Sequence, residues 1–303
     1  MRLFYWAKAS LLAGALALAS LGQSLAATAG ETIEIKGEVI DTWCYFSGVM
    51  GGPDAVTGSA HHTCALWCAA GGIPVGVRTE DGQVYLVLKL EGQDPLEPTD
   101  AVMEIQTDVI TARGKHYLRD GVNYIVVEKI VANDGIQYLN HEIMARCRRS
   151  RPPKNRKRNK GSSAMHIGTT MLRAAAFAGA VAIAMSSASA KDYSQGSKAK
   201  EWGLLGEEKA LFSGKVVDLL CELAGDCADN CGNGNRNLGI VRADDGKLIT
   251  VLKNRQPAFN GATEDLLPYC NKDVDVDGTM IGEDENSPSR FYLVQLIRET
   301  GTE

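Results

Sequence analysis

The chain carries the same cysteine-containing pattern twice, and this repeat constrains the fold more than any other feature. The first copy consists of three blocks, at residues 37–44, 64–68 and 77–89, and the second copy repeats them at 214–221, 227–231 and 241–253. Spacing inside each block is identical, and only the loops between blocks differ in length, as expected for a duplicated module with drifting surface loops. The sequence therefore predicts two homologous modules.

The two modules, which we place at residues 30–145 and 191–303, are both acidic. The first has 17 acidic and 7 basic side chains, and the second has 20 and 13. An acidic balance of this size argues against a nucleic acid partner. Between the modules, 9 basic residues fall within 146–160. Such a run cannot form a core, so we interpret 146–164 as a disordered basic linker, with an arm for anionic partners as the alternative.

Two apolar segments resemble secretory signals. Residues 1–29 combine Arg2 and Lys8, an apolar run, and small residues before a cleavage site, and residues 165–190 repeat this order. Both runs are shorter than the roughly 18 to 20 apolar residues of a membrane span, which favours cleavage of the two segments over membrane anchoring. We therefore expect a periplasmic or secreted protein with no stable membrane span. For the second run, a buried core helix or an internal anchor remains the alternative.

The order of these segments is inconsistent for one exported chain. The basic run would lie outside if the first signal exports module one, yet positive charge before an apolar segment belongs on the cytoplasmic side. The simplest explanation is that two separately exported proteins have been joined, with Met165 a former start.

Alternating apolar and polar residues predict five strands in each module. The first strand would carry a bulge at Gly37, and a helix is expected from His61 to Ala70. The expected strands are 32–40, 73–78, 83–90, 102–111 and 122–131 in module one, and 211–218, 238–242, 247–253, 272–279 and 290–297 in module two. The fold class is therefore mostly β: two tandem small Greek-key barrels, each with a short cysteine-bearing helix, with a sandwich as the alternative.

By strand order and glycine placement, each module resembles small exported cysteine-containing proteins with an OB-like fold. The resemblance covers most of each module and implies a fold rather than a named functional family. Residues 273–278 also match the start of an EF-hand calcium loop, but their alternation predicts a strand.

Module one contains a candidate metal site. On a helix, Cys64 and Cys68 lie one turn apart, with His61 on the same face, and Cys44 at the end of the first strand could meet them. Three thiolates and an imidazole suit zinc or copper. The alternatives are a disulfide that leaves one thiol over, or redox chemistry at the cysteine pair.

Module two has four cysteines and no histidine. These are candidates for two disulfides: Cys221, Cys227, Cys231 and Cys270.

The chain contains none of the haem-attachment, thioredoxin, serine-hydrolase or phosphate-loop motifs, so an enzyme is not expected. We interpret it as an exported binding or accessory protein. A thiol-disulfide or electron-transfer protein, and a structural subunit that docks on another exported protein, are the alternatives.

Overall fold

The computed structural model describes residues 30–97, 101–138, 191–256, 259–282 and 290–302. The predicted signals at 1–29 and 165–190 and the predicted linker at 146–164 lie outside these ranges. The strands of the described part form two closed barrels, which together belong to one compact unit. The prediction of a mostly β chain is therefore confirmed.

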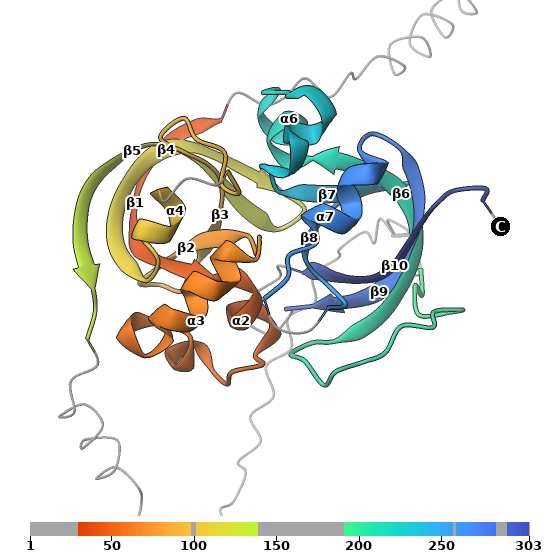
Figure 1. Ribbon diagram of the computed structural model, residues 1–303, viewed down its shortest axis with the longest axis horizontal. Coiled ribbons are helices and arrows are strands. Elements are labelled where there is room, and N and C mark those ends of the chain that lie inside the picture. Colours follow the sequence, from red (N-terminus) through yellow and green to blue (C-terminus); the bar gives the residue numbers. More distant parts are fainter. Residues whose placement is uncertain (1–29, 98–100, 139–190, 257–258, 283–289, 303) are drawn as a thin grey trace, which may run out of the picture. The chain divides into compact units, whose positions relative to one another are not determined.

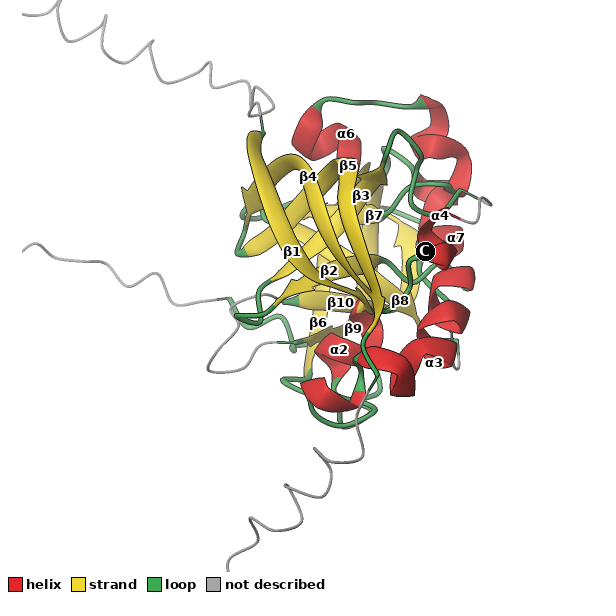
Figure 2. Ribbon diagram, turned by 90° about the vertical axis from the view of Figure 1, so that its left-hand side faces the viewer, coloured by secondary structure: helices red, strands yellow, loops and turns green. Residues whose placement is uncertain are grey.

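The first barrel has the strand order β1-β2-β3-β5-β4 (Figure 1), and its helices α3 and α4 lie on the same side of the strands (Figure 2). Strand β3 runs parallel to β5, and every other pair is antiparallel. Its elements are β1 (Glu31–Asp41), α2 (Thr42–Ser47), η1 (Pro53–Ala55), α3 (Gly58–Ala70), β2 (Val75–Thr79), β3 (Val84–Leu90), α4 (Ala101–Glu104), β4 (Asp108–Arg119) and β5 (Val122–Ile136).

The second barrel repeats this arrangement, with the strand order β10-β8-β7-β6-β9. Here β8 is parallel to β10, as β3 is to β5. Its elements are β6 (Glu208–Asp218), α6 (Leu219–Ala224), η2 (Asp229–Gly234), β7 (Leu238–Arg242), β8 (Leu248–Asn254), α7 (Thr263–Leu266), η3 (Leu267–Tyr269), β9 (Asp273–Ile281) and β10 (Phe291–Glu299). The EF-hand-like segment is thus part of strand β9.

Two local predictions were wrong. The strand expected at 102–111 begins only at Asp108, because the helix-forming residues of α4 (Ala101–Glu104) come first. The bulge expected at Gly37 is absent: this residue pairs in register with Thr79 on one side and Ile110 on the other. Glycine is needed there because a Cβ would lie 2.4 Å from the carbonyl oxygen of Arg78.

The two barrels have separate apolar interiors and share a third apolar cluster between them. In the shared cluster, the rings of Phe46 and Phe291 lie 4.1 Å apart, and the buried hydroxyls of Tyr124 and Thr250 are hydrogen-bonded at 2.7 Å. Helix α2 packs on β8, and the equivalent helix α6 packs on the equivalent strand β3. Each module therefore covers the other with the same elements, as in an isologous dimer interface.

Candidate metal centre

Asp41 joins strand β1 to helix α2 and sets the position of Cys44. Its Oδ1 accepts from the backbone N–H of Trp43 at 2.9 Å and of Cys44 at 3.2 Å, which is the N-cap arrangement. The cap leaves Oδ2 free to point elsewhere. Cys44 follows in the first turn of α2 and is buried.

Helix α3 (Gly58–Ala70) supplies the other three predicted donors, confirming the expected helix. His61, Cys64 and Cys68 are spaced by three and four residues and so share one face. His61 and Cys68 are buried, whereas Cys64 is partly exposed. His62 turns to the other side, where its Nδ1 lies 3.0 Å from the carbonyl oxygen of Gln106 and 2.8 Å from the hydroxyl of Thr107.

Four donor atoms converge at this place. One atom each from Asp41, Cys44, His61 and Cys64 lies within 4.8 Å of all the others. The thiol of Cys68 adjoins this group and interacts with Cys44 and Asp41. The structure thus brings three of the four predicted residues, Cys44, His61 and Cys64, together with a carboxylate, and the fourth, Cys68, lies beside this group.

Two buried polar atoms in the cluster lack a hydrogen-bond partner. They are Oδ2 of Asp41 and Nε2 of His61, which face each other at 3.5 Å. A buried polar atom without a partner costs roughly 1 to 3 kcal/mol, so such atoms rarely occur without a reason. A metal ion held by both would remove this cost, and the donor set of sulfur, nitrogen and oxygen fits zinc.

The thiols and the imidazole influence one another electrostatically. The hydrogen bond from Cys68 lowers the pKa of Cys44, and it raises the pKa of Cys68. Burial raises the pKa of Cys64 to about 11. Burial alone lowers the pKa of His61, but Asp41 and Cys44 outweigh it and raise the pKa to about 9.

Asp41 also stays ionised in this setting. Burial by itself raises its pKa, but the neighbouring His61, Cys68 and Cys44 outweigh burial and lower it. Without a metal ion, the cluster therefore holds an ionised carboxylate beside a protonated imidazole. A metal ion that binds both residues has to displace the imidazole proton.

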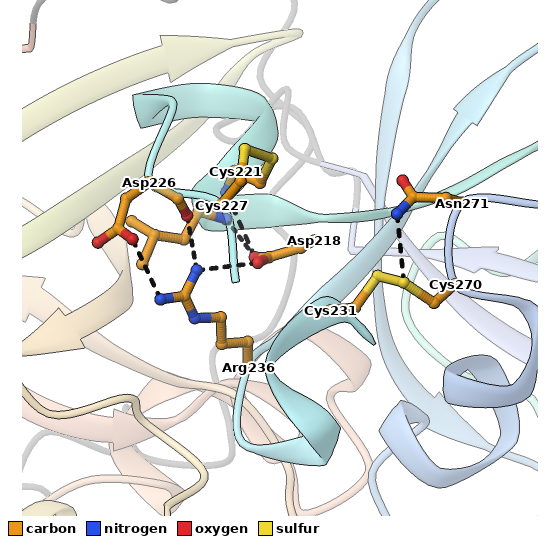
Figure 3. The surroundings of a disulfide bond; sticks show 9 residues. Asp218, Cys221, Asp226, Cys227, Cys231, Arg236, Cys270 and Asn271 are labelled. Carbon is orange, nitrogen blue, oxygen red and sulfur yellow. Dashed lines mark hydrogen bonds and ion pairs between the residues drawn. A yellow bond between two sulfur atoms is a disulfide. The ribbon is translucent and has the colours of Figure 1, made fainter. Parts of the chain in front are cut away.

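The equivalent place in the second barrel holds an arginine instead (Figure 3). Asp218 caps α6 as Asp41 caps α2, but its Oδ2 accepts from Arg236 Nη1 at 3.0 Å. The guanidinium also binds the backbone carbonyl oxygen of Asp226 at 2.6 Å and a carboxylate oxygen of Asp94 at 3.0 Å. A permanently charged arginine thus faces Asp218, where a histidine faces Asp41 in the first barrel.

The cysteines of the second barrel are all paired. Cys221 is joined to Cys227, and Cys231 is joined to Cys270 (Figure 3). In the described residues, the free cysteines are Cys44, Cys64 and Cys68. Within one chain, therefore, the two copies use their cysteines differently: as disulfides in one barrel and as free thiols around a carboxylate and a histidine in the other.

Sequence reasoning missed Asp41 as a site residue, although it occurs at the same place in both repeats. Its N-cap role explains that recurrence without any ligand, so the pattern alone gave no reason to add it.

Comparison of the chain with protein-family models, with curated proteins and with solved structures found no significant match in any of the three. Among the residues that the structure describes, no helix has the length and apolar character needed to cross a membrane.

Proposed function

We propose that this chain is an exported, non-enzymatic metal-binding protein that holds one zinc ion in its first barrel. The ligands are Asp41, Cys44, His61 and Cys64, whose donor atoms lie within 4.8 Å of one another. The observation that carries the proposal is the pair of buried, unpartnered atoms, Asp41 Oδ2 and His61 Nε2, inside a cluster of free thiols. An ion would satisfy both atoms at once.

Zinc suits this donor set better than copper(I). A carboxylate and an imidazole together with two thiolates are ordinary zinc ligands, whereas copper(I) selects sulfur. Cys68 then acts as a neighbour that donates to the sulfur of Cys44. Copper(I) would instead draw Cys68 into the ligand set and leave Asp41 out.

Export is part of the proposal. Its support is the signal-like pattern of residues 1–29 and the disulfides of the second barrel, which persist in oxidising compartments.

We further propose that both modules are OB-like. Strand order 1-2-3-5-4 with a parallel 3-5 pair in both barrels supports this, since the OB-fold is a five-stranded Greek-key barrel. Such a module would serve as an accessory to another exported protein.

One observation favours a thiol-disulfide function as the second candidate. Cys44 and Cys68 are both free and buried, and Cys68 lowers the pKa of Cys44, as expected for an attacking thiol with a resolving partner. The two thiols would then form one disulfide, passing two electrons and two protons to a partner disulfide that becomes two thiols. Cys44 is buried, however, which restricts access of such a partner.

The test uses the full chain, purified without chelator. Native mass spectrometry should show one zinc ion, which is lost in Cys44→Ser and His61→Ala but kept in the control His62→Ala, because His62 contacts Gln106 and Thr107 instead. Peptide mapping after alkylation under denaturing conditions should find Cys44, Cys64 and Cys68 all as thiols. A metal-free protein with two of these three joined would overturn the proposal.

The same variants separate zinc from copper. If copper(I) is the natural ion, loading under reducing conditions should give one ion whose binding depends on Cys68 and is unchanged by Asp41→Asn. If zinc is the ion, Asp41→Asn should weaken binding more than Cys68→Ser.

A further inference from the structure

A lysine from the second barrel is buried beside the metal centre of the first. Lys253, near the end of β8, has a relative exposure of 1%. Its Nζ lies 5.6 Å from the ring centroid of Trp43, the residue before Cys44. Helix α2, which contains both Trp43 and Cys44, packs directly on β8. A buried ammonium group is costly unless negative charge lies near it.

The lysine is held in place by its own barrel. Its Nζ donates to the carbonyl oxygen of Gln256 at 2.7 Å and to that of Asn260 at 3.3 Å. These acceptors are neutral, so they fix the direction of the ammonium group without supplying the opposite charge. The nearest opposite charge lies across the interface, in the cluster around Asp41. Burial lowers the pKa of Lys253 overall, and the groups of this cluster act in the opposite direction without outweighing burial.

Residues 259–261, which follow Lys253 along the chain, also contact helix α3, the helix that carries His61 and Cys64. Gly261 N–H donates to the carbonyl oxygen of Gly71, just beyond the end of α3, at 2.9 Å. The ring of Phe259 stacks on Trp67 at a centroid distance of 6.1 Å. A Cβ on Gly71 would lie 1.9 Å from the carbonyl oxygen of Phe259, so the close approach requires glycine there. The second barrel therefore contacts both helices that supply cysteines to the site.

The net charge of the proposed zinc site gives a reason for the burial of Lys253 beside it. A site formed by one carboxylate and two thiolates around a divalent ion has one negative charge left over. In a buried place that charge needs a partner, and Lys253 brings one positive charge.

We propose that Lys253 is the counter-charge of the zinc centre, so that the metal site of the first barrel is complete only when the second barrel is docked on it. This inference rests on the proposed zinc site. It makes Lys253 a positioning residue of the site and the second barrel its obligatory partner.

The repeat provides a matched control. Lys89 is the residue equivalent to Lys253, and its Nζ reaches the cysteine segment of the second barrel, where it binds Asp226 Oδ2 at 2.8 Å. The cysteines there, Cys221 and Cys227, are joined in a disulfide, and neither belongs to a candidate metal site among the residues that the structure describes. Lys89→Met therefore removes the same charge from the same interface without touching the metal centre.

The experiment compares zinc affinity in the full chain by chelator competition. Lys253→Met should weaken zinc binding about 10- to 100-fold, the range found for outer-sphere partners of metal ligands, while Lys253→Arg should stay within about 3-fold of the wild type. Lys89→Met should bind zinc as the wild type does. Urea unfolding of the metal-free proteins monitors the fold, and Lys253→Gln replaces the methionine variant if that one does not fold.

A double-mutant cycle separates charge from packing. If Lys253 acts through its charge, its removal should cost less in an Asp41→Asn background, where the site has lost one negative charge. Additive losses, or wild-type affinity in Lys253→Met, would overturn the inference and leave the zinc site standing. Absence of zinc from the wild-type chain would instead overturn the proposed function.

Discussion

Asp41 and Asp218 hold the same position in the two barrels and cap equivalent helices, yet their second carboxylate oxygens face different groups. Asp218 Oδ2 pairs with Arg236 at 3.0 Å, whereas Asp41 Oδ2 faces His61 at 3.5 Å without a hydrogen bond. One aspartate is paired with an arginine that is always charged, and the other faces a histidine that can lose its proton and bind a metal ion.

This contrast predicts different effects of the same substitution. Asp218→Asn leaves Arg236 buried with less negative charge and should destabilise the protein by about 3 kcal/mol, since breaking a buried ion pair typically costs about 3 to 5 kcal/mol. Asp41→Asn keeps the cap acceptor, and His61 can lose its proton where an arginine cannot, so the metal-free protein should be destabilised less than by Asp218→Asn, while zinc binding should weaken at least 10-fold. Urea unfolding and chelator competition measure the two effects. Equal destabilisation by both would contradict the assignment.

A second prediction concerns the contact between α3 and the second barrel. Gly71→Ala places a Cβ against the backbone of Phe259 and should destabilise the chain by about 1 to 3 kcal/mol, as overpacking does. The control is Gly52→Ala, where a Cβ would meet nothing within 4 Å, and where alanine should be neutral or slightly stabilising. If thermal unfolding gives the same midpoint for both variants, residues 259–261 do not dock on α3.

A third prediction tests the interface between the barrels. With a protease site introduced at residues 146–164, the two halves should stay together on size-exclusion chromatography after cleavage. The shared apolar cluster and the ion pairs Arg119–Glu222 at 2.6 Å and Arg236–Asp94 at 3.0 Å would hold them. Phe46→Ala, which removes the ring packed on Phe291, should make the cut halves separate more readily. Separation of the unmutated halves at micromolar concentration would contradict the interface.

A fourth prediction distinguishes structural cysteines from metal ligands. Replacing both Cys231 and Cys270 by alanine removes a disulfide that closes a loop of 39 residues, and should lower stability by about 3 to 4 kcal/mol. Zinc affinity should not change, because this disulfide belongs to the interior of the second barrel. Loss of zinc in the folded double variant would mean that the two cysteine groups are not independent.

Much of the barrel architecture could be predicted because strands and helices leave periodic patterns of apolar residues in the local sequence. The strands follow alternating apolar residues, and the helix with His61, Cys64 and Cys68 follows its own spacing. Local pattern was misleading at 102–111, where Val102 and the strand beginning at Asp108 both contribute apolar residues, but a short helix separates them.

Equal spacing also did not reveal how differently the two cysteine pairs fold. Between Cys64 and Cys68 lie alanine, leucine and tryptophan within helix α3, whereas Asn230, Gly232 and Asn233 around Cys231 adopt left-handed backbone conformations. Asparagine and glycine tolerate that region far better than other residues. The members of the second pair join different partners: Cys227 is bonded to Cys221, and Cys231 is bonded to Cys270.

Lys253 could not have been identified from the sequence. Its relevance depends on the docking of one barrel on the other, and a repeat pattern describes each module alone. Contacts of this kind depend on tertiary structure, which is also why the equivalent Lys89 looks the same in sequence but meets Asp226.

The zinc-edge X-ray absorption spectrum of the full chain loaded with one equivalent of zinc identifies the atoms bound to the ion. A zinc ion held by Asp41, Cys44, His61 and Cys64 should have two sulfur neighbours at about 2.3 Å and two nitrogen or oxygen neighbours at about 2.0 to 2.1 Å. One sulfur neighbour should disappear in Cys44→Ser. A shell of nitrogen and oxygen alone would contradict a zinc centre formed by Asp41, Cys44, His61 and Cys64.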